Sequence, residues 1–134
     1  MKYKEVKRHS NVGQHVSHYS IDENGYACGE HRSYHHNGQL RWHHFSLSGY
    51  RYGEVKTFNS DGTPDHHNLK DGKGNELATV IRYGKPATHT EEQLIKIAKE
   101  HNLPLLSELP KTEAERTLWN LKHPAMSCLP NIST

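Results

Sequence analysis

Apolar and polar residues alternate along the first two thirds of the chain, and this pattern changes near Pro86. Before that point, short alternating segments are separated by glycine-containing turns such as Asn37-Gly38 and Asp61-Gly62, which is typical of β-hairpins. After it, apolar residues recur at helical spacing, which is typical of amphipathic helices. The pattern predicts an α+β protein, with an antiparallel β-meander over about residues 3–83 and two short helices over about residues 90–122.

The hairpin region contains one segment twice, at a constant offset of 24 residues. We call these segments the second and third copies. Gly29-Glu30 recurs as Gly53-Glu54, and the matches continue with Tyr34 and Phe58, Asn37-Gly38 and Asp61-Gly62, His43 and His67, and Phe45 and Leu69. Weaker copies cover residues 1–20, with a turn at Gly13, and residues 70–83. A fixed period of this length is typical of repeat architectures, in which each copy packs against its neighbours.

A two-residue turn at Asn37-Gly38 predicts which residues of the second copy face each other. On one face the expected pairs are Tyr34 with Arg41, Arg32 with His43, and Glu30 with Phe45; on the other they are His31 with His44, Ser33 with Trp42, and His35 with Leu40. Most residues of the first set recur in the third copy, whereas the second set does not. We call the two sides the recurring face and the variable face. Because stacking of copies needs the recurring positions, we expect the variable face to carry a specific function.

Two helix starts are marked after Pro86. Thr90 with Gln93 fits a capping box, and Thr112 with Glu115 repeats the signal. The apolar positions that follow are Leu94, Ile97 and Ala98 in the first helix, and Ala114, Leu118 and Leu121, with Trp119 beside them, in the second. Helices this short do not bury their apolar stripes alone. We therefore expect them to pair with each other and to close the open end of the sheet.

These elements divide a single domain into three stretches. Residues 1–86 form the hairpin repeat region, residues 87–123 form a helical cap of the same domain, and residues 124–134 form a tail. The tail contains two prolines and no apolar periodicity. We therefore expect the tail to be loosely ordered.

The repeated motifs have a counterpart in a known family. Gly-Glu-x3-Tyr-x2-Asn-Gly-x-Leu and Gly-Glu-x3-Phe-x2-Asp-Gly resemble the MORN repeat variant, and the resemblance covers about residues 5–83. Bacterial proteins with such repeats are often grouped as YwqK-family antitoxins. The resemblance implies consecutive antiparallel hairpins in an elongated, single-layer sheet that serves as a binding surface without catalysis.

The composition limits the cellular location and the classes of partner that we expect for the protein. The chain has 134 residues, 13 of them histidines, and a net charge of only +2 with histidine neutral, which does not by itself argue for nucleic acid. Cys28 and Cys128 are far apart in sequence and are expected to be reduced thiols. The charged start of the chain does not fit a signal peptide, and no stretch approaches the roughly 18 apolar residues of a membrane span. We therefore expect a cytoplasmic protein that does not enter a membrane.

Histidine-rich stretches raise the question of metal binding. His31 and His44 are expected to lie opposite each other, with His35 nearby, and three imidazoles can bind zinc or copper. A structural zinc site, however, usually has four ligands at near-fixed spacing, and the chain has no CxxC or HExxH motif. We expect no cofactor, and these three histidines are the candidate ligands if zinc is bound.

No motif for covalent catalysis is present. The chain has neither a nucleophile elbow nor a catalytic cysteine signature, so no catalytic residue is assigned and no enzymatic activity is expected. A nuclease that uses histidine as general acid and base is one alternative. Nucleic-acid binding is another, because arginines such as Arg32 and Arg41 alternate with aromatic side chains that stack on bases.

Binding of another protein is the function that the residue types favour. Tryptophan, tyrosine and arginine anchor protein interfaces. The predicted partner-binding residues are His31, His35, Arg41, Trp42, His44, Tyr50, Arg51 and Tyr52. Binding would inhibit the partner if the protein acts as an antitoxin-like or phage-encoded inhibitor. In an alternative interpretation the C-terminal helices cover Trp42, and the interface then lies on the face with histidine and arginine. Open sheet edges would also allow a homodimer.

Overall fold

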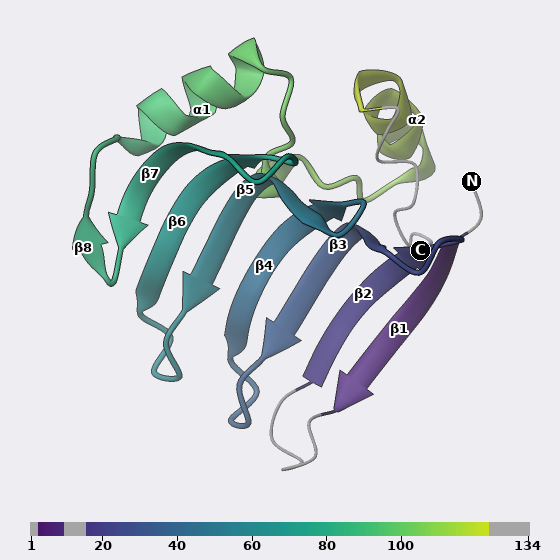
Figure 1. Ribbon diagram of the computed structural model, residues 1–134, viewed down its shortest axis with the longest axis horizontal. Helices are drawn as coiled ribbons and strands as arrows, with labels where there is room; N and C mark the ends of the chain where they lie inside the picture. The colour runs from purple at the N-terminus through teal and green to yellow at the C-terminus, as the bar shows by residue number, and fades with distance from the viewer. Residues whose placement is uncertain (1–2, 10–15, 124–134) are drawn as a thin grey trace.

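A computed structural model describes residues 3–9 and 16–123 of the chain. Within these residues it contains one eight-stranded antiparallel sheet and two α-helices (Figure 1). The elements are β1 (Tyr3–His9), β2 (Val16–Asp22), β3 (Ala27–Tyr34), β4 (Leu40–Leu47), β5 (Tyr50–Phe58), β6 (Pro64–Asp71), β7 (Glu76–Arg82), β8 (Lys85–Pro86), α1 (Glu91–Glu100), the 3-10 turn η1 (Leu106–Glu108) and α2 (Glu113–Lys122). The strands lie in the sheet in their sequence order, so the predicted α+β meander is confirmed.

Two expectations fall outside the described residues: the turn of the first copy at Gly13, and the loose order of the tail 124–134. In the described part, no helix is long and apolar enough to cross a membrane.

The middle of each hairpin has the predicted register. In the second copy Glu30 pairs with Phe45, Arg32 with His43, His31 with His44, and Ser33 with Trp42. In the third copy Glu54 pairs with Leu69 and Lys56 with His67. The assignment of these residues to the recurring and variable faces is therefore confirmed, because paired residues of antiparallel strands share a face.

The turn at Asn37-Gly38 is not the predicted two-residue turn. The backbone N–H of His35 donates to Gln39 O at 2.7 Å, and Gly38 alone takes a positive φ, of 87°. A type I′ turn needs positive φ at both central residues, so this loop is instead a type I turn followed by a glycine bulge. Tyr34 consequently pairs with Leu40, and the predicted pairs of Tyr34 with Arg41 and of His35 with Leu40 are wrong.

The third copy repeats this turn. Gly62 has the positive φ, of 89°, and Phe58 pairs with Pro64. A two-residue turn at Asp61-Gly62 predicts instead that Phe58 pairs with Asp65, and this prediction is wrong for the same reason. Two-residue turns with positive φ at both positions are found at the opposite ends of the strands, at Ser48-Gly49 and Tyr83-Gly84.

The helices cover the recurring face of the sheet. Figure 1 shows α1 over the β6–β7 end of the sheet and α2 nearer its middle. Leu94 and Ala98 of α1 are fully buried in a cluster with Leu69, and Trp119 of α2 stacks on Phe45 with ring centroids 5.4 Å apart. The expectation that the helices pair with each other is therefore wrong, because each packs against the sheet in a separate cluster. Phe45 and Leu69 offer each helix a larger apolar surface than the other helix does.

The predicted helix starts are confirmed, but the predicted stripe of α2 is not. Thr90 and Gln93 form the capping box, and Thr112 accepts a hydrogen bond from the N–H of Glu115. In α2 only Trp119 is buried, at 4% exposure, whereas Leu118 is 65% exposed and Leu121 77% exposed. Insertion of the large indole against Phe45 orients the helix, and this orientation turns both leucines outward.

Candidate partner-binding surface

The variable face carries a cluster of four ring side chains from three neighbouring strands. We call it the aromatic–histidine cluster, and its members are Tyr19, His31, Trp42 and His44. His31 lies at its centre: its ring centroid is 4.9 Å from that of Tyr19, 4.8 Å from His44 and 6.0 Å from Trp42. The register of β3 with β4 places His31 and His44 directly opposite each other, and β2 contributes Tyr19.

A β-bulge brings Arg41 to this cluster. The register between β3 and β4 shifts next to Tyr34: Ser33 pairs with Trp42 and Tyr34 with Leu40, so Arg41 is the bulged residue between them. Its side chain then lies on the variable face, where Cζ is 3.8 Å from the centroid of the Trp42 ring. Nε and Nη2 of Arg41 both donate to Ser33 Oγ, at 3.1 and 2.7 Å. Bulges commonly re-aim a side chain in this way, and the result here is a cation–π contact.

Both histidines of the cluster are neutral at pH 7. Burial lowers the pKa of His31 to about 4, together with the positive charges of Arg51 and Arg41. Burial and Arg51 likewise lower the pKa of His44 to about 3, although the hydrogen bond to the Phe45 carbonyl acts in the opposite direction. In that bond His44 Nδ1 donates to Phe45 O at 3.0 Å. The proton of the neutral imidazole is therefore on Nδ1, and Nε2 is an acceptor.

Two buried polar atoms of the cluster have no hydrogen-bond partner among the described residues. These atoms are His31 Nε2 and Trp42 Nε1. An unsatisfied buried polar group costs about 1–3 kcal/mol of stability. Each unsatisfied buried group of this kind in a native structure calls for an explanation, such as a functional role.

The structure brings together five of the eight predicted partner-binding residues. His31, Trp42 and His44 belong to the cluster, Arg41 stacks on it, and Arg51 lies on the same face, opposite Ser46 of β4.

The other three predicted residues lie elsewhere. His35 is at a hairpin tip, where its Nε2 donates to Phe58 O at 2.9 Å. Tyr50 is 56% exposed and pairs with Leu47 at the opposite end of the strands. Tyr52 faces the helices and packs against both apolar clusters of the recurring face. The sequence did not single out Tyr19; the position opposite His31 on the neighbouring strand would have been the signal.

The candidate zinc ligands do not form a metal site. His35 is held by Phe58 O and does not join His31 and His44. Among the residues that the structure describes, no group of three or more His, Cys, Asp or Glu side chains is placed to hold a metal ion.

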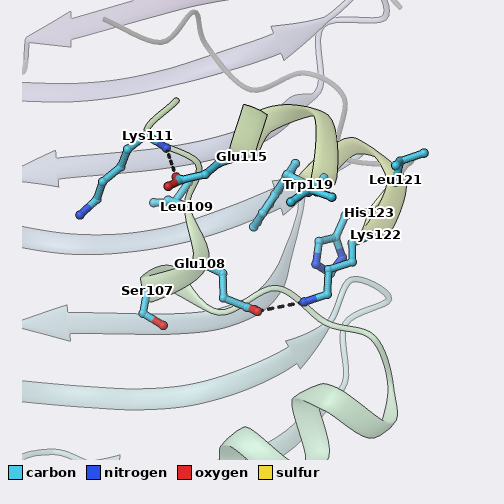
Figure 2. Close-up of a pocket in the computed structure, with 10 residues that line it drawn as sticks. Ser107, Glu108, Leu109, Lys111, Glu115, Trp119, Leu121, Lys122 and His123 are labelled. Carbon is cyan, nitrogen blue, oxygen red and sulfur yellow. Dashed lines mark hydrogen bonds and ion pairs between the residues drawn. The ribbon is translucent and has the colours of Figure 1, made fainter. Parts of the chain in front are cut away.

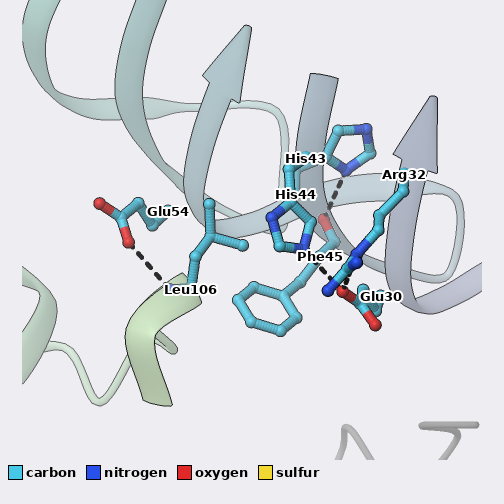
Figure 3. A network of polar contacts seen from close by, with 7 residues as sticks. All are labelled: Glu30, Arg32, His43, His44, Phe45, Glu54 and Leu106. Carbon is cyan, nitrogen blue, oxygen red and sulfur yellow. Dashed lines mark hydrogen bonds and ion pairs between the residues drawn. The ribbon is translucent and has the colours of Figure 1, made fainter. Parts of the chain in front are cut away.

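The recurring face contains a network that the sequence reasoning missed (Figure 3). Glu30 Oε2 accepts hydrogen bonds from His43 Nε2 at 2.7 Å and from Arg32 Nε at 2.5 Å. Burial opposes ionisation of Glu30, but the hydrogen bond from His43 and the charge of Arg32 outweigh it and lower its pKa. The hydrogen bond between Glu30 and His43 links the adjacent strands β3 and β4.

The same pair occurs one period later. Glu54 Oε2 accepts from His67 Nε2 at 2.6 Å, and Glu54 Oε1 accepts from the backbone N–H of Leu106 at 2.8 Å. Burial would raise the pKa of Glu54, but these two hydrogen bonds lower it. Glu54 therefore anchors the segment after α1 to the sheet. The recurrence of Glu and His at an offset of 24 residues was the signal that could have identified both pairs.

A groove of about 650 Å³ lies between α2 and the segment before it (Figure 2). Leu118, Leu121 and Trp119 line it, and an ion pair between Lys122 and Glu108, at 3.1 Å, closes one side. The helical pattern did not predict this groove, because it places both leucines in the core.

Comparison with known proteins adds no relative: no family model, curated protein or solved structure matches this chain. The functional assignment therefore depends on the geometry of the variable face.

Proposed function

We propose that this chain is a non-catalytic, cytoplasmic protein-binding module built of MORN-like hairpin repeats, and that it binds a partner protein through the aromatic–histidine cluster and the two adjacent arginines. One observation carries the proposal. Trp42 contacts the guanidinium of Arg41 and makes a T-shaped ring contact with His31, on the face opposite to the one that α1 and α2 cover.

The chemistry of the cluster suits an interface anchor. Hot spots of protein interfaces are enriched in tryptophan, tyrosine and arginine. Ring stacking and the two hydrogen bonds of Arg41 to Ser33 fix these side chains before binding, which reduces the entropy that association costs. The imidazoles of His31 and His44 are uncharged at pH 7, so a partner can cover them without desolvating a charge.

The two arginines indicate which partner surface fits. Arg41 and Arg51 add positive charge beside neutral rings, which favours a partner with carboxylates around an apolar centre. Occlusion of such a surface would inhibit an enzyme that uses it, as an antitoxin-like or phage-encoded inhibitor would.

The proposal is tested by affinity capture from a lysate of the natural host. The wild-type chain should retain one protein specifically, and Trp42→Ala should lose most of it because the ring that anchors the interface is gone. The matched control is Tyr83→Ser, which removes an aromatic ring that is 76% exposed and outside the cluster. Circular dichroism should show that both variants are folded.

The outcomes separate the hypotheses. Equal recovery by wild type and Trp42→Ala would contradict the proposed surface. Recovery that disappears after nuclease treatment and falls steeply with salt would indicate nucleic-acid binding instead.

A further inference from the structure

Helix α2 carries an apolar stripe that faces solvent. Ala114, Leu118 and Leu121 follow one another at spacings of four and three residues, which places them along one side of the helix. All three are exposed, Leu118 by 65% and Leu121 by 77%. Trp119, which holds the helix to Phe45, lies on a different side of α2. The stripe therefore has no covering layer among the residues that the structure describes.

The stripe has the shape of a helix-packing surface. Contiguous exposed apolar residues mark interaction sites, whereas single ones do not. The two leucines also line the groove of about 650 Å³ beside α2, together with Leu109. Packed helices lie about 8–10 Å apart, so a helix laid along the stripe would cover both leucines and one wall of the groove.

The charges beside the stripe indicate which helix fits it. Glu115 and Lys122 are seven residues apart, so they lie on the same flank of α2, one near its start and the other at its end. Figure 2 shows both side chains reaching toward residues 107–111. Thr117, on the other flank, is uncharged. An acidic and a basic residue at opposite ends of one flank are complementary to the same flank running in the opposite direction.

We infer that α2 binds α2 of a second copy of this chain as an antiparallel pair. A two-fold axis beside Leu118 brings the same flank of both helices together with the direction reversed. Glu115 of each copy then lies level with Lys122 of the other, which gives two identical ion pairs. Leu118 meets its counterpart at the axis, and Leu121 lies between Ala114 and Leu118 of the other copy.

The contacts that the two charged residues make within the chain leave capacity for these pairs. Glu115 Oε2 accepts a hydrogen bond from the backbone N–H of Lys111 at 2.8 Å, and Lys122 Nζ lies 3.1 Å from a carboxylate oxygen of Glu108. A carboxylate accepts at two oxygens and an ammonium has three N–H groups, so each takes a second partner without losing the first. The antiparallel direction also sets the two helix dipoles against each other favourably.

A dimer of this kind leaves the variable face uncovered. α2 packs on the recurring face through Trp119, and the aromatic–histidine cluster lies on the opposite face. Each dimer therefore presents the cluster twice, which raises the avidity for a partner with repeated sites. Dimerisation does not depend on what the cluster binds.

Sedimentation equilibrium of the full-length, untagged chain tests the pair. The wild type should dimerise reversibly with a Kd of about 100 µM, because two short helices bury less than the roughly 1,200 Å² of a standard interface. Leu118→Ser should weaken the dimer at least tenfold. Leu118 is 65% exposed, so circular dichroism should show that this variant is folded.

Charge reversal tests the direction of the pair. Glu115→Lys should weaken the dimer at least tenfold, because two pairs of like charges then face each other, and Lys122→Glu should do the same. An equimolar mixture of these two variants should dimerise like the wild type, since their flanks are complementary again. The matched control is Glu113→Lys, which makes the same charge change in the same helical turn but away from the flank and should leave the Kd unchanged.

Three outcomes would overturn the antiparallel pair. A chain that stays monomeric up to about 1 mM would show that the stripe is covered in another way, by a different protein or by another segment of the chain. A dimer that keeps its affinity in Leu118→Ser would identify another surface, such as an open edge of the sheet. A mixture of Glu115→Lys and Lys122→Glu that stays monomeric would contradict the pairing of their flanks.

Discussion

His31 and His44 are the residues whose chemistry depends most on their surroundings. As free imidazoles both would be partly charged near pH 6.5, yet in the folded chain burial keeps them neutral down to about pH 4 and about pH 3. Sequence alone could place the two rings opposite each other. It could not reveal that Arg41 joins them, because the bulge that re-aims Arg41 depends on the type of the turn.

The pH dependence of stability tests this neutral state. The unfolded chain takes up protons near pH 6.5, whereas the folded chain takes them up only near pH 4 and below, so the contribution of these groups is complete above pH 6.5 and is lost as the pH falls. At pH 5 each histidine should lower the free energy of unfolding by about 2 kcal/mol or less relative to pH 7.5. Urea denaturation at both pH values measures this difference.

Two variants test whether His44 causes this loss of stability at low pH. His44→Gln should reduce the difference between the two pH values, and the control His36→Gln, which removes an exposed imidazole at a hairpin tip, should leave it unchanged. An unaltered difference in His44→Gln would show that His44 is not the group responsible.

The position of Gly53 against Pro104 makes a second prediction at the residue scale. Gly53→Ala should destabilise the chain more than Gly25→Ala, because both have positive φ but only the first places a Cβ against the Pro104 backbone. The positive φ itself costs about 1–2 kcal/mol in either variant. Thermal unfolding of the two variants side by side gives the comparison, and equal losses would mean that Pro104 does not lie on Gly53.

At the scale of elements, the hairpins and helices show which features the sequence pattern predicts and which it does not. The interior register was predicted from a two-residue turn, and it is correct although the turn differs, because the bulge at Arg41 restores the pairing of Ser33 with Trp42. The turns did not follow, since Asn-Gly and Asp-Gly fit both a two-residue loop and a bulged type I loop. The helices were located by their caps, but the side on which they pack depends on Phe45 and Leu69, which lie far from them in sequence.

The two-residue turn at Ser48-Gly49 predicts a stabilising change. Ser48 has a φ of 50°, which serine tolerates poorly and asparagine adopts more readily. Ser48→Asn should therefore raise the free energy of unfolding by about 0.5 kcal/mol. The control Ser60→Asn changes an exposed serine without a positive φ and should have no effect. A loss of stability in Ser48→Asn would contradict the assigned turn.

The attachment of α2 depends on one side chain. Trp119→Ala should lower the free energy of unfolding by about 3–5 kcal/mol, because the indole is buried against Phe45. Leu121→Ser changes an apolar residue of the same helix that is 77% exposed and should cost little. Chemical denaturation measures both, and a small effect of Trp119→Ala would mean that α2 is held to the sheet in another way.

At the scale of the whole molecule, the two faces of one sheet have different roles. The recurring face supports the helical layer through Phe45, Leu69 and Glu54. The variable face carries the aromatic–histidine cluster. The edge strand β8 consists only of Lys85 and Pro86, which discourages pairing with another sheet. We therefore expect a partner to bind to a face of the sheet and not to its edges.

The most direct test of the proposed partner-binding surface is the affinity of the captured partner for the purified chain and its variants. Titration calorimetry should give a Kd that Trp42→Ala weakens at least tenfold, about 1.4 kcal/mol, as expected for an interface anchor. Tyr83→Ser should leave the Kd unchanged. A partner that binds Trp42→Ala as tightly as the wild type would contradict the assignment of binding to the variable face.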